Sequence, residues 1–246
     1  MQSFLLLLAG IGAGLTGTIA GLASLVSYPA LLAVGLPPVA ANVTNTVALV
    51  LNGVGATLGN RAELVGQWRR VRQLGVASVL GGIVGGTLLL TTPSDAFEKI
   101  VPWLIGLGSF TILLRRPPVA SVSSGVRPGW PTLAGTFLIG IYGGYFGAAA
   151  GVLLLAVLLA TTADALARVS ALRNVVLALA NGVAATGFIL FGPVVWWAAV
   201  PLGVGFFIGG RLGPIVVRHA PADALRLVIA LAGLALAVYL ALKAYF

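Results

Sequence analysis

The chain has 246 residues, of which 59% are apolar and only 8% are charged, and its mean hydropathy is +1.10. Soluble domains carry about 25% charged residues, so this composition excludes an ordinary soluble protein and predicts a polytopic membrane protein. The net charge of +9 is explained by cationic loops at the lipid headgroups. Nucleic-acid binding is not indicated, because the sequence has no basic run with interleaved aromatic residues. With no cysteine, one histidine and no paired carboxylates inside a segment, the sequence offers no metal site, cofactor site or catalytic constellation. We therefore expect a protein that is not an enzyme.

Apolar runs between polar or proline-rich breaks predict eight membrane segments. Because roughly 20 apolar residues span a bilayer, eight segments use almost the whole chain and leave no room for a soluble domain. The polar stretch 117–130 divides the chain into a first repeat, 1–116, and a second repeat, 131–246. In chain order the segments are 4–35, 40–60, 73–91, 97–114, 131–161, 166–191, 194–215 and 222–244.

The segments 4–35 and 131–161 are too long for a single crossing at about 1.5 Å per residue. Each has glycines in its middle, and their 4-3-4 spacing is the same in both halves. These glycines are Gly10, Gly14, Gly17 and Gly21 in the first half and Gly140, Gly144, Gly147 and Gly151 in the second. Each segment is either a re-entrant hairpin of two half-length helices or one tilted helix with a break.

The distribution of basic residues favours the re-entrant hairpins. If both long segments are re-entrant, the loops between the six crossing segments place 12 of the 14 Lys and Arg residues on one side. If both span instead, the split is 8 to 6, which the positive-inside rule disfavours. We therefore predict an all-α polytopic membrane protein of two inverted-topology repeats. Each repeat is a glycine-broken re-entrant hairpin plus three transmembrane helices, and both termini lie outside.

The segment after each hairpin carries the same polar pattern. Residues 45–57 and 174–186 are identical at seven of thirteen positions. The matching asparagines are Asn45 and Asn52 in the first half and Asn174 and Asn181 in the second. Within each half the two asparagines are two helical turns apart and share one face. An isolated asparagine usually bonds a neighbouring helix, but repetition in register favours a binding site, since unpaired amides are costly in hydrocarbon.

We expect the two asparagine faces to meet near the midplane, with the hairpin tips between them. Half-helix N-termini there would present unpaired N–H groups and positive dipole ends to an anion. The predicted substrate-binding residues are Asn45, Asn52, Asn174, Asn181, Arg173, Ser170, Thr16, Thr18, Tyr142 and Tyr145, with Ser24 and Ser27 as further hydroxyl donors. The predicted positions of hinge or close backbone approach are Gly14, Gly17, Gly21, Gly144, Gly147 and Gly151. Arg173 has a competing interpretation as an anchor that snorkels from its helix end.

The acidic residues all fall at predicted segment ends or in loops: Glu63, Asp95, Glu98, Asp164 and Asp223. No carboxylate is therefore expected at mid-membrane to relay protons or hold Na⁺, which disfavours a cation pump. Glycines at 81, 85 and 86 recur at 205, 209 and 210, and this small-xxx-small spacing indicates close helix packing. It allows a homodimer without requiring one.

The stretch Gly12–Leu32, GAGLTGTIAGLASLVSYPALL, resembles the glycine-rich first repeat of the TauE/SafE family of bacterial sulfite and organosulfonate exporters and related permeases. The likeness continues through Gly35–Pro38 and Ala40–Thr57, and it returns at Gly140–Gly151 and Ala171–Trp196. The resemblance implies a multi-pass carrier of the bacterial cytoplasmic (inner) membrane for small sulfur-containing or carboxylated anions.

The preferred function is a secondary transporter that exports small anions, first of all sulfite or organosulfonates. An inside-negative potential favours anion exit by about 2.3 kcal/mol per charge at 100 mV. The alternatives are an anion channel with re-entrant selectivity loops, a permease for other small carboxylated anions, and a membrane subunit that anchors a partner. The expected partners are a small anionic substrate, the lipid bilayer and, optionally, a second copy of the chain.

Overall fold

The computed structural model describes residues 1–114, 128–162, 164–216 and 222–245, and all regular structure in them is α-helical, which confirms the all-α class. The predicted linker lies mostly outside the described residues, and its last residue, Trp130, already belongs to a helix. The helices are α1 (Gln2–Ala20), α2 (Ala23–Ala33), α3 (Pro38–Gly59), α4 (Arg61–Leu64), α5 (Trp68–Thr91), α6 (Ser94–Leu114), α7 (Trp130–Tyr145), α8 (Ala150–Thr161), α9 (Leu166–Phe191), α10 (Trp196–Val216) and α11 (Ala222–Tyr245).

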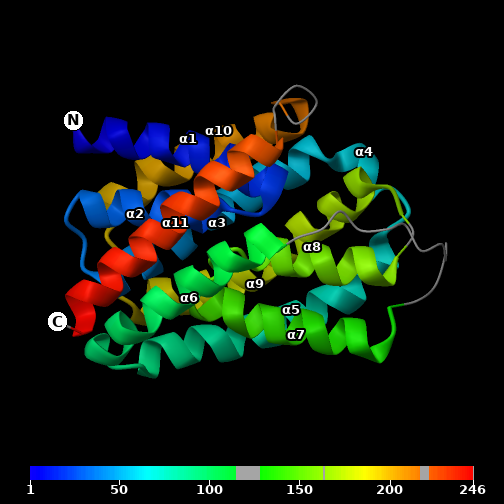
Figure 1. Cartoon of the computed structure of the whole chain (residues 1–246). Helices are drawn as coiled ribbons and strands as arrows, with labels where there is room; N and C mark the ends of the chain where they lie inside the picture. Colours follow the sequence, from blue (N-terminus) through cyan, green and yellow to red (C-terminus); the bar gives the residue numbers. More distant parts are fainter. Residues whose placement is uncertain (115–127, 163, 217–221, 246) are drawn as a thin grey trace.

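Both long segments are divided into two helices near a glycine in the left-handed conformation. The helix α1 ends at Gly21, which has a φ of 78° and donates its N–H to Gly17 O at 2.8 Å. Between α7 and α8, Gly147 has a φ of 74°. Glycine adopts this conformation without the steric cost of a Cβ, which explains why the helices break there. Figure 1 shows α2 folded back beside α1 and α8 folded back from α7. We call α1–α2 the first hairpin and α7–α8 the second hairpin.

The tips of the two hairpins touch in the middle of the bundle. A Cβ built on Gly151 would lie 2.6 Å from Gly21 Cα, so only two glycines permit this approach. In Figure 1 the first hairpin reaches the middle from the end where α1 begins and α11 finishes, and the second hairpin reaches it from the other end. The orientation of these ends in a bilayer stays a prediction.

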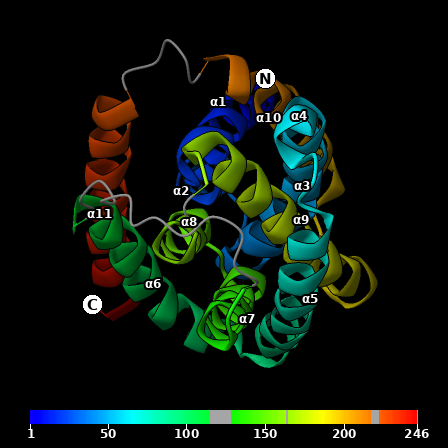
Figure 2. The ribbon, with the colours of Figure 1, turned by 90° about the vertical axis from the view of Figure 1, so that its right-hand side faces the viewer.

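Helices that match under the duplication make matching contacts in the two halves. The helix α1 packs on α10 as α7 packs on α5, and α3 packs on α10 as α9 packs on α5. Glycines line these contacts: a Cβ on Gly14 would come 2.8 Å from a carbonyl of α10, and one on Gly144 would come 2.6 Å from a carbonyl of α5. Gly81 and Gly205 face α7 and α1 in the same way, so the packing predicted for these glycines is confirmed. The helices α6 and α11 pair at one side of the bundle (Figure 2).

Within the described part of the chain, five helices are long and apolar enough to cross a membrane: α1, α3, α5, α9 and the Leu227–Tyr245 part of α11. The helices α6 and α10, which the sequence also predicts as crossing segments, each end beside a stretch outside the described residues. The helices α2 and α8 have 11 and 12 residues, too few for a hydrocarbon core about 30 Å thick. Because α1 is long and apolar enough to cross the membrane, its placement in a re-entrant hairpin stays a prediction.

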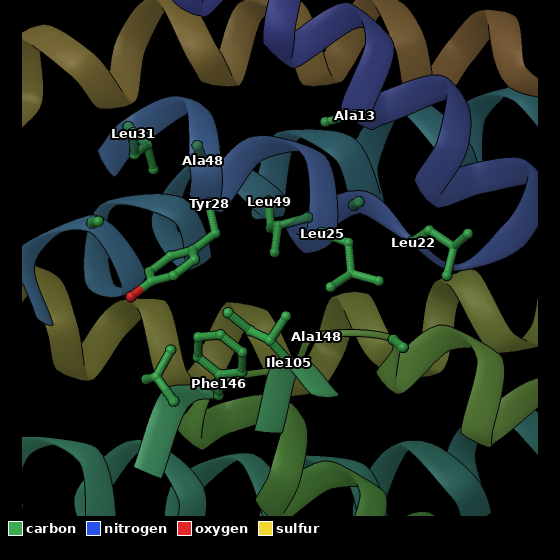
Figure 3. Close-up of a cluster of buried hydrophobic side chains, with 14 of the residues drawn as sticks. Ala13, Leu22, Leu25, Tyr28, Leu31, Ala48, Leu49, Ile105, Phe146 and Ala148 are labelled. Carbon is green, nitrogen blue, oxygen red and sulfur yellow. The ribbon is translucent and has the colours of Figure 1, made fainter. Parts of the chain in front are cut away.

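An apolar core joins the first hairpin to the turn of the second. Leu22, just before α2, and Leu25 and Tyr28 of α2 are buried near Phe146 and Ala148, which lie between α7 and α8 (Figure 3). The rings of Tyr28 and Phe146 meet edge to face with their centroids 5.2 Å apart, a favoured aromatic geometry. This core fixes the two tips relative to each other and so positions the residues around them.

Candidate functional site

A cavity of about 60 Å³ lies where the hairpin tips meet α3 and α9, and we call it the central cavity. It has room for a few water molecules or one small ion, and it is far below the roughly 300–1,000 Å³ typical of sites for drug-sized ligands. The lining residues are Gly17, Gly21, Ala23 and Ser24 from the first hairpin, Gly147, Ala150 and Gly151 from the second, Leu49, Asn52, Gly53 and Ala56 from α3, and Arg173, Asn174, Leu177, Ala178 and Asn181 from α9.

Many residues predicted for the site thus converge on one cavity. They are Asn52, Asn174, Asn181, Arg173 and Ser24 among the polar residues, and Gly17, Gly21, Gly147 and Gly151 among the glycines. Polar residues from both halves of the duplicated pattern, far apart in the chain, face the same small volume. Their role in binding a substrate stays a prediction.

Arg173 is fully buried, with 0% of its surface exposed, and it reaches from α9 to the first hairpin. Its Nη2 donates to Thr18 O at 2.7 Å and to Gly17 O at 3.3 Å. These carbonyls belong to the last turn of α1, at the negative end of the helix dipole, and Gly17 O also accepts the N–H of Gly21 at 2.8 Å. The guanidinium therefore points into the protein and caps α1, which is not the geometry of a snorkelling anchor.

Asn174 lines the cavity beside Arg173 and is hydrogen-bonded to it. Its Oδ1 accepts from Arg173 Nη2 at 2.7 Å and from Nε at 3.1 Å, which sets the orientation of the amide. Its Nδ2 is then a buried donor without a hydrogen-bond partner among the described residues, and Asn52 Oδ1 is a buried acceptor in the same condition. Buried polar groups are nearly always paired, so the Nδ2 of Asn174 indicates a place for water or a ligand. Asn52 Oδ1 lies against α10 instead, where a Cβ built on Gly210 would come 2.6 Å from it.

Two helices begin at the central cavity. Ala23 and Ser24 are the first residues of α2, Ala150 and Gly151 are the first residues of α8, and all four line the cavity. The first N–H groups of a helix have no intrahelical acceptor, and the N-terminal end of the dipole is positive. Both half-length helices thus direct positive potential at the volume beside Arg173, an arrangement that suits an anion.

Asn45, the counterpart of Asn174 in the first half, does not line the central cavity. It is fully buried; its Oδ1 accepts from Ser27 Oγ at 2.6 Å and its Nδ2 donates to Ser24 Oγ at 3.2 Å. Asn45 therefore holds α2 against α3, and it reaches the cavity only through Ser24. The two halves use corresponding asparagines differently, because only the second half has an arginine beside its asparagine.

The predicted threonines lie near the tip of the first hairpin but bond its backbone. Thr16 Oγ1 donates to Ala13 O at 3.1 Å, and Thr18 Oγ1 donates to Gly14 O at 2.9 Å. Ser170 is half-buried on α9, one turn before Asn174. None of the three hydroxyls is among the lining groups of the central cavity.

The predicted tyrosines stabilise the second hairpin. Tyr142 Oη donates to Ala148 O at 2.5 Å and so closes the turn between α7 and α8. Tyr145 is half-buried and packs on Phe97 of α6, with ring centroids 5.8 Å apart. Neither lines the central cavity, so in this conformation both support the tip rather than face the cavity.

Sequence reasoning missed Asn42, which is buried on α3 and donates from Nδ2 to Tyr145 O at 2.8 Å, at the end of α7. Asn42 holds the second hairpin from α3, much as Arg173 holds the first from α9. Its equivalent in the second half is Ala171, so a search for polar residues repeated in both halves does not find Asn42. The apolar lining of α3 was also missed, although Leu49 and Ala56 lie three residues before and four residues after Asn52 and share its face.

Comparison with known proteins shows which family the chain belongs to. The sequence model of the family described as "Sulfite exporter TauE/SafE" matches residues 6–240, nearly the whole chain. The chain belongs to the TauE/SafE family. Its membership makes it a membrane transporter with a small-molecule substrate, working in a lipid bilayer.

Relatives of this TauE/SafE protein carry transporter names. The chain is 26% identical over 238 residues to "Probable membrane transporter protein ORF9" of Sinorhizobium sp, covering 96% of this chain and 90% of the relative. It is 30% identical over 210 residues to "Probable membrane transporter protein YfcA" of Escherichia coli K12, covering 83% and 77%. A "Probable membrane transporter protein" of Haemophilus influenzae is 26% identical over 87% of this chain and 84% of its own length. No solved structure matches the chain.

Proposed function

We propose that this TauE/SafE protein is a carrier that exports small anions, namely sulfite or an organosulfonate, through the central cavity. The observation that carries the proposal is the fully buried guanidinium of Arg173 on the wall of a small cavity, where two half-length helices also begin. A cation and two positive helix ends around one volume lower the free energy of an anion and raise that of a cation. Short carboxylates present the same charge and similar oxygens, so they form the second candidate substrate class.

Amide groups would replace part of the water shell of the anion. The buried Nδ2 of Asn174 is a donor without a described partner, and Asn181 and Asn52 bring further amides to the cavity wall. Desolvating an anion is expensive unless each lost water is replaced by a hydrogen bond. The amides, the guanidinium and the helix N–H groups together supply such donors.

The contact between the hairpin tips favours a carrier over a channel. Gly21 and Gly151 approach so closely at the wall of the cavity that an ion could not pass between them without a movement of the hairpins. A carrier moves in this way in each cycle, whereas a channel keeps a continuous path while it conducts.

A flux assay with the purified protein in proteoliposomes tests the function. We expect saturable transport of sulfite or a sulfonate such as sulfoacetate, stimulated by the same anion on the opposite side. Asn181→Ala is expected to lower the flux at low substrate concentration by about tenfold or more, since a hydrogen bond to a charged group contributes roughly 1.5–3 kcal/mol. Asn60→Ala, at the end of α3 and outside the cavity lining, is the control. Ohmic single-channel currents, or equal flux in the Asn181 variant and the wild type, would contradict the proposal.

We infer that the two halves are inverted repeats of a bacterial inner-membrane protein with both termini outside. Two observations support this arrangement. The contacts among α1, α3 and α10 match those among α7, α9 and α5, and the basic residues are distributed asymmetrically. Reporter fusions at residue 192 and after residue 246 are expected to give periplasmic signals only. A cytoplasmic signal at either position would overturn the inverted topology.

A further inference from the structure

A second and larger cavity, of about 510 Å³, lies between α2, α6 and α11, and we call it the peripheral cavity. Its wall includes Tyr28 and Pro29 of α2, Glu98 of α6, and Tyr239 and Lys243 of α11. It shares no lining residue with the central cavity. Its volume accommodates a small organic anion together with water.

One pair of aromatic rings stands between the two cavities. On α2, Ser24 lines the central cavity and Tyr28, one helical turn further on, lines the peripheral cavity. In the second hairpin, Phe146 directly precedes Gly147, which lines the central cavity. The Tyr28 ring meets the Phe146 ring edge to face, with centroids 5.2 Å apart, and Figure 3 shows the two side by side.

The Phe146 ring is held in place by a further aromatic contact, whereas the Tyr28 hydroxyl lacks a hydrogen bond within the described residues. Phe146 also packs on Phe97 of α6 at a centroid distance of 6.1 Å, so its ring is held from behind. Tyr28 is buried, but its hydroxyl has no hydrogen-bond partner among the described residues. The ring contact favours the present position of Tyr28, whereas the missing hydrogen bond opposes it, by free energies of similar size. Glu98 and Lys243 also line the peripheral cavity, so a rotation of Tyr28 into it would bring its hydroxyl toward polar groups.

We propose that Tyr28 and Phe146 form a gate between the central cavity and the peripheral cavity, and that the peripheral cavity is the vestibule through which the transported anion enters or leaves. This inference rests on the proposed transport function. Tyr28 is the moving part of the gate and Phe146 is the surface on which it closes. The vestibule lies at the end of the bundle where α1 begins and α11 finishes (Figure 1).

The wild-type chain has no cysteine, so single cysteines report access directly. Ala178→Cys places a thiol in the lining of the central cavity, and Ala33→Cys places one in the lining of the peripheral cavity. The probe is a membrane-impermeant anionic methanethiosulfonate added to sealed vesicles in the orientation where Ala33→Cys reacts. In that orientation Ala178→Cys is expected to react slowly. Adding Tyr28→Ala or Phe146→Ala is expected to accelerate its labelling about tenfold, the fold-change that corresponds to loss of an aromatic pair.

Two further variants separate the gate from general loosening of the core. Phe188→Ala removes a fully buried ring that lines neither cavity, and it is expected to leave the labelling of Ala178→Cys slow. Tyr28→Phe keeps the ring and removes the unpaired hydroxyl, so it is expected to slow both labelling and anion flux. Unchanged labelling in both alanine variants, or faster labelling in Tyr28→Phe, would overturn the gate. Labelling needs no transported substrate, so absence of anion flux with the expected labelling pattern would refute the proposed function alone.

Discussion

Replacing Arg173 with glutamine is expected to reduce anion flux at low substrate concentration by about 100-fold or more. Removing one partner of a buried, hydrogen-bonded charge costs about 2–5 kcal/mol, and 1.4 kcal/mol corresponds to a factor of ten. The change removes the positive charge from the central cavity and the donors to Gly17 O and Thr18 O. The measurement is the initial rate of anion uptake into proteoliposomes as a function of substrate concentration.

Matched variants distinguish the charge of Arg173 from its capping of α1. Arg173→Lys keeps the charge but not the planar fork, so we expect it to retain more flux than Arg173→Gln. Arg69→Gln removes the same charge from an exposed position on α5, and it is expected to transport like the wild type. Equal flux in the lysine and glutamine variants, with both proteins folded, would show that the charge does not contribute to transport.

Replacing Gly151 with alanine is expected to force the hairpin tips apart, destabilise the protein and abolish transport. The new Cβ would lie 2.6 Å from Gly21 Cα, which is backbone and cannot rotate away. Overpacking of this kind costs about 1–3 kcal/mol. Gly21→Ala is expected to be worse, because its Cβ would also meet the backbone of Gly151 and its φ of 78° adds a left-handed penalty of about 1–2 kcal/mol. Thermal unfolding of the purified protein and anion flux measure the two effects.

Gly182→Ala is the control for the tip variants. Gly182 belongs to α9, and a Cβ built there would meet nothing within 4 Å. Because glycine inside a helix is less favourable than alanine by about 0.5–1 kcal/mol, this variant is expected to be as stable as the wild type or slightly more stable. If Gly151→Ala unfolds at the same temperature as Gly182→Ala and transports normally, the tips do not need the close approach.

Much of the fold could be predicted because it depends on local properties of the chain. The breaks at Gly21 and Gly147 follow from glycine's access to positive φ inside segments too long for one crossing. Glycines at helical spacing predict close helix packing, because they let backbones approach. Which helices they join, α1 with α10 and α7 with α5, came from the structure. The predicted linker could not be assessed, since residues 115–127 lie outside the described part of the chain.

The candidate site was predicted only in part because repetition does not reveal which partner a side chain finds. Asn45 and Asn174 occupy equivalent positions, yet Asn45 bonds Ser24 and Ser27 while Asn174 bonds Arg173. Asn42 has a clear structural partner and no counterpart in the other half. The repeated pattern also does not show that a hydroxyl can hydrogen-bond within its own helix. A threonine can donate to the carbonyl three or four residues before it, and Thr16 and Thr18 both do so.

The sequence by itself determined the membrane class, the two broken hairpins and the polar faces of α3 and α9, because hydrophobicity, helical period and glycine's backbone freedom act within a few residues of the chain. Only the tertiary structure decided that Arg173 is buried against the end of α1, that Asn52, Asn174 and Asn181 share one cavity with two helix N-termini, and that the ring of Tyr28 packs on that of Phe146. The pairs Arg173–Thr18, Tyr28–Phe146 and Asn52–Asn174 each join residues more than 100 positions apart. Their geometry depends on how the helices are stacked and rotated, which no local pattern specifies.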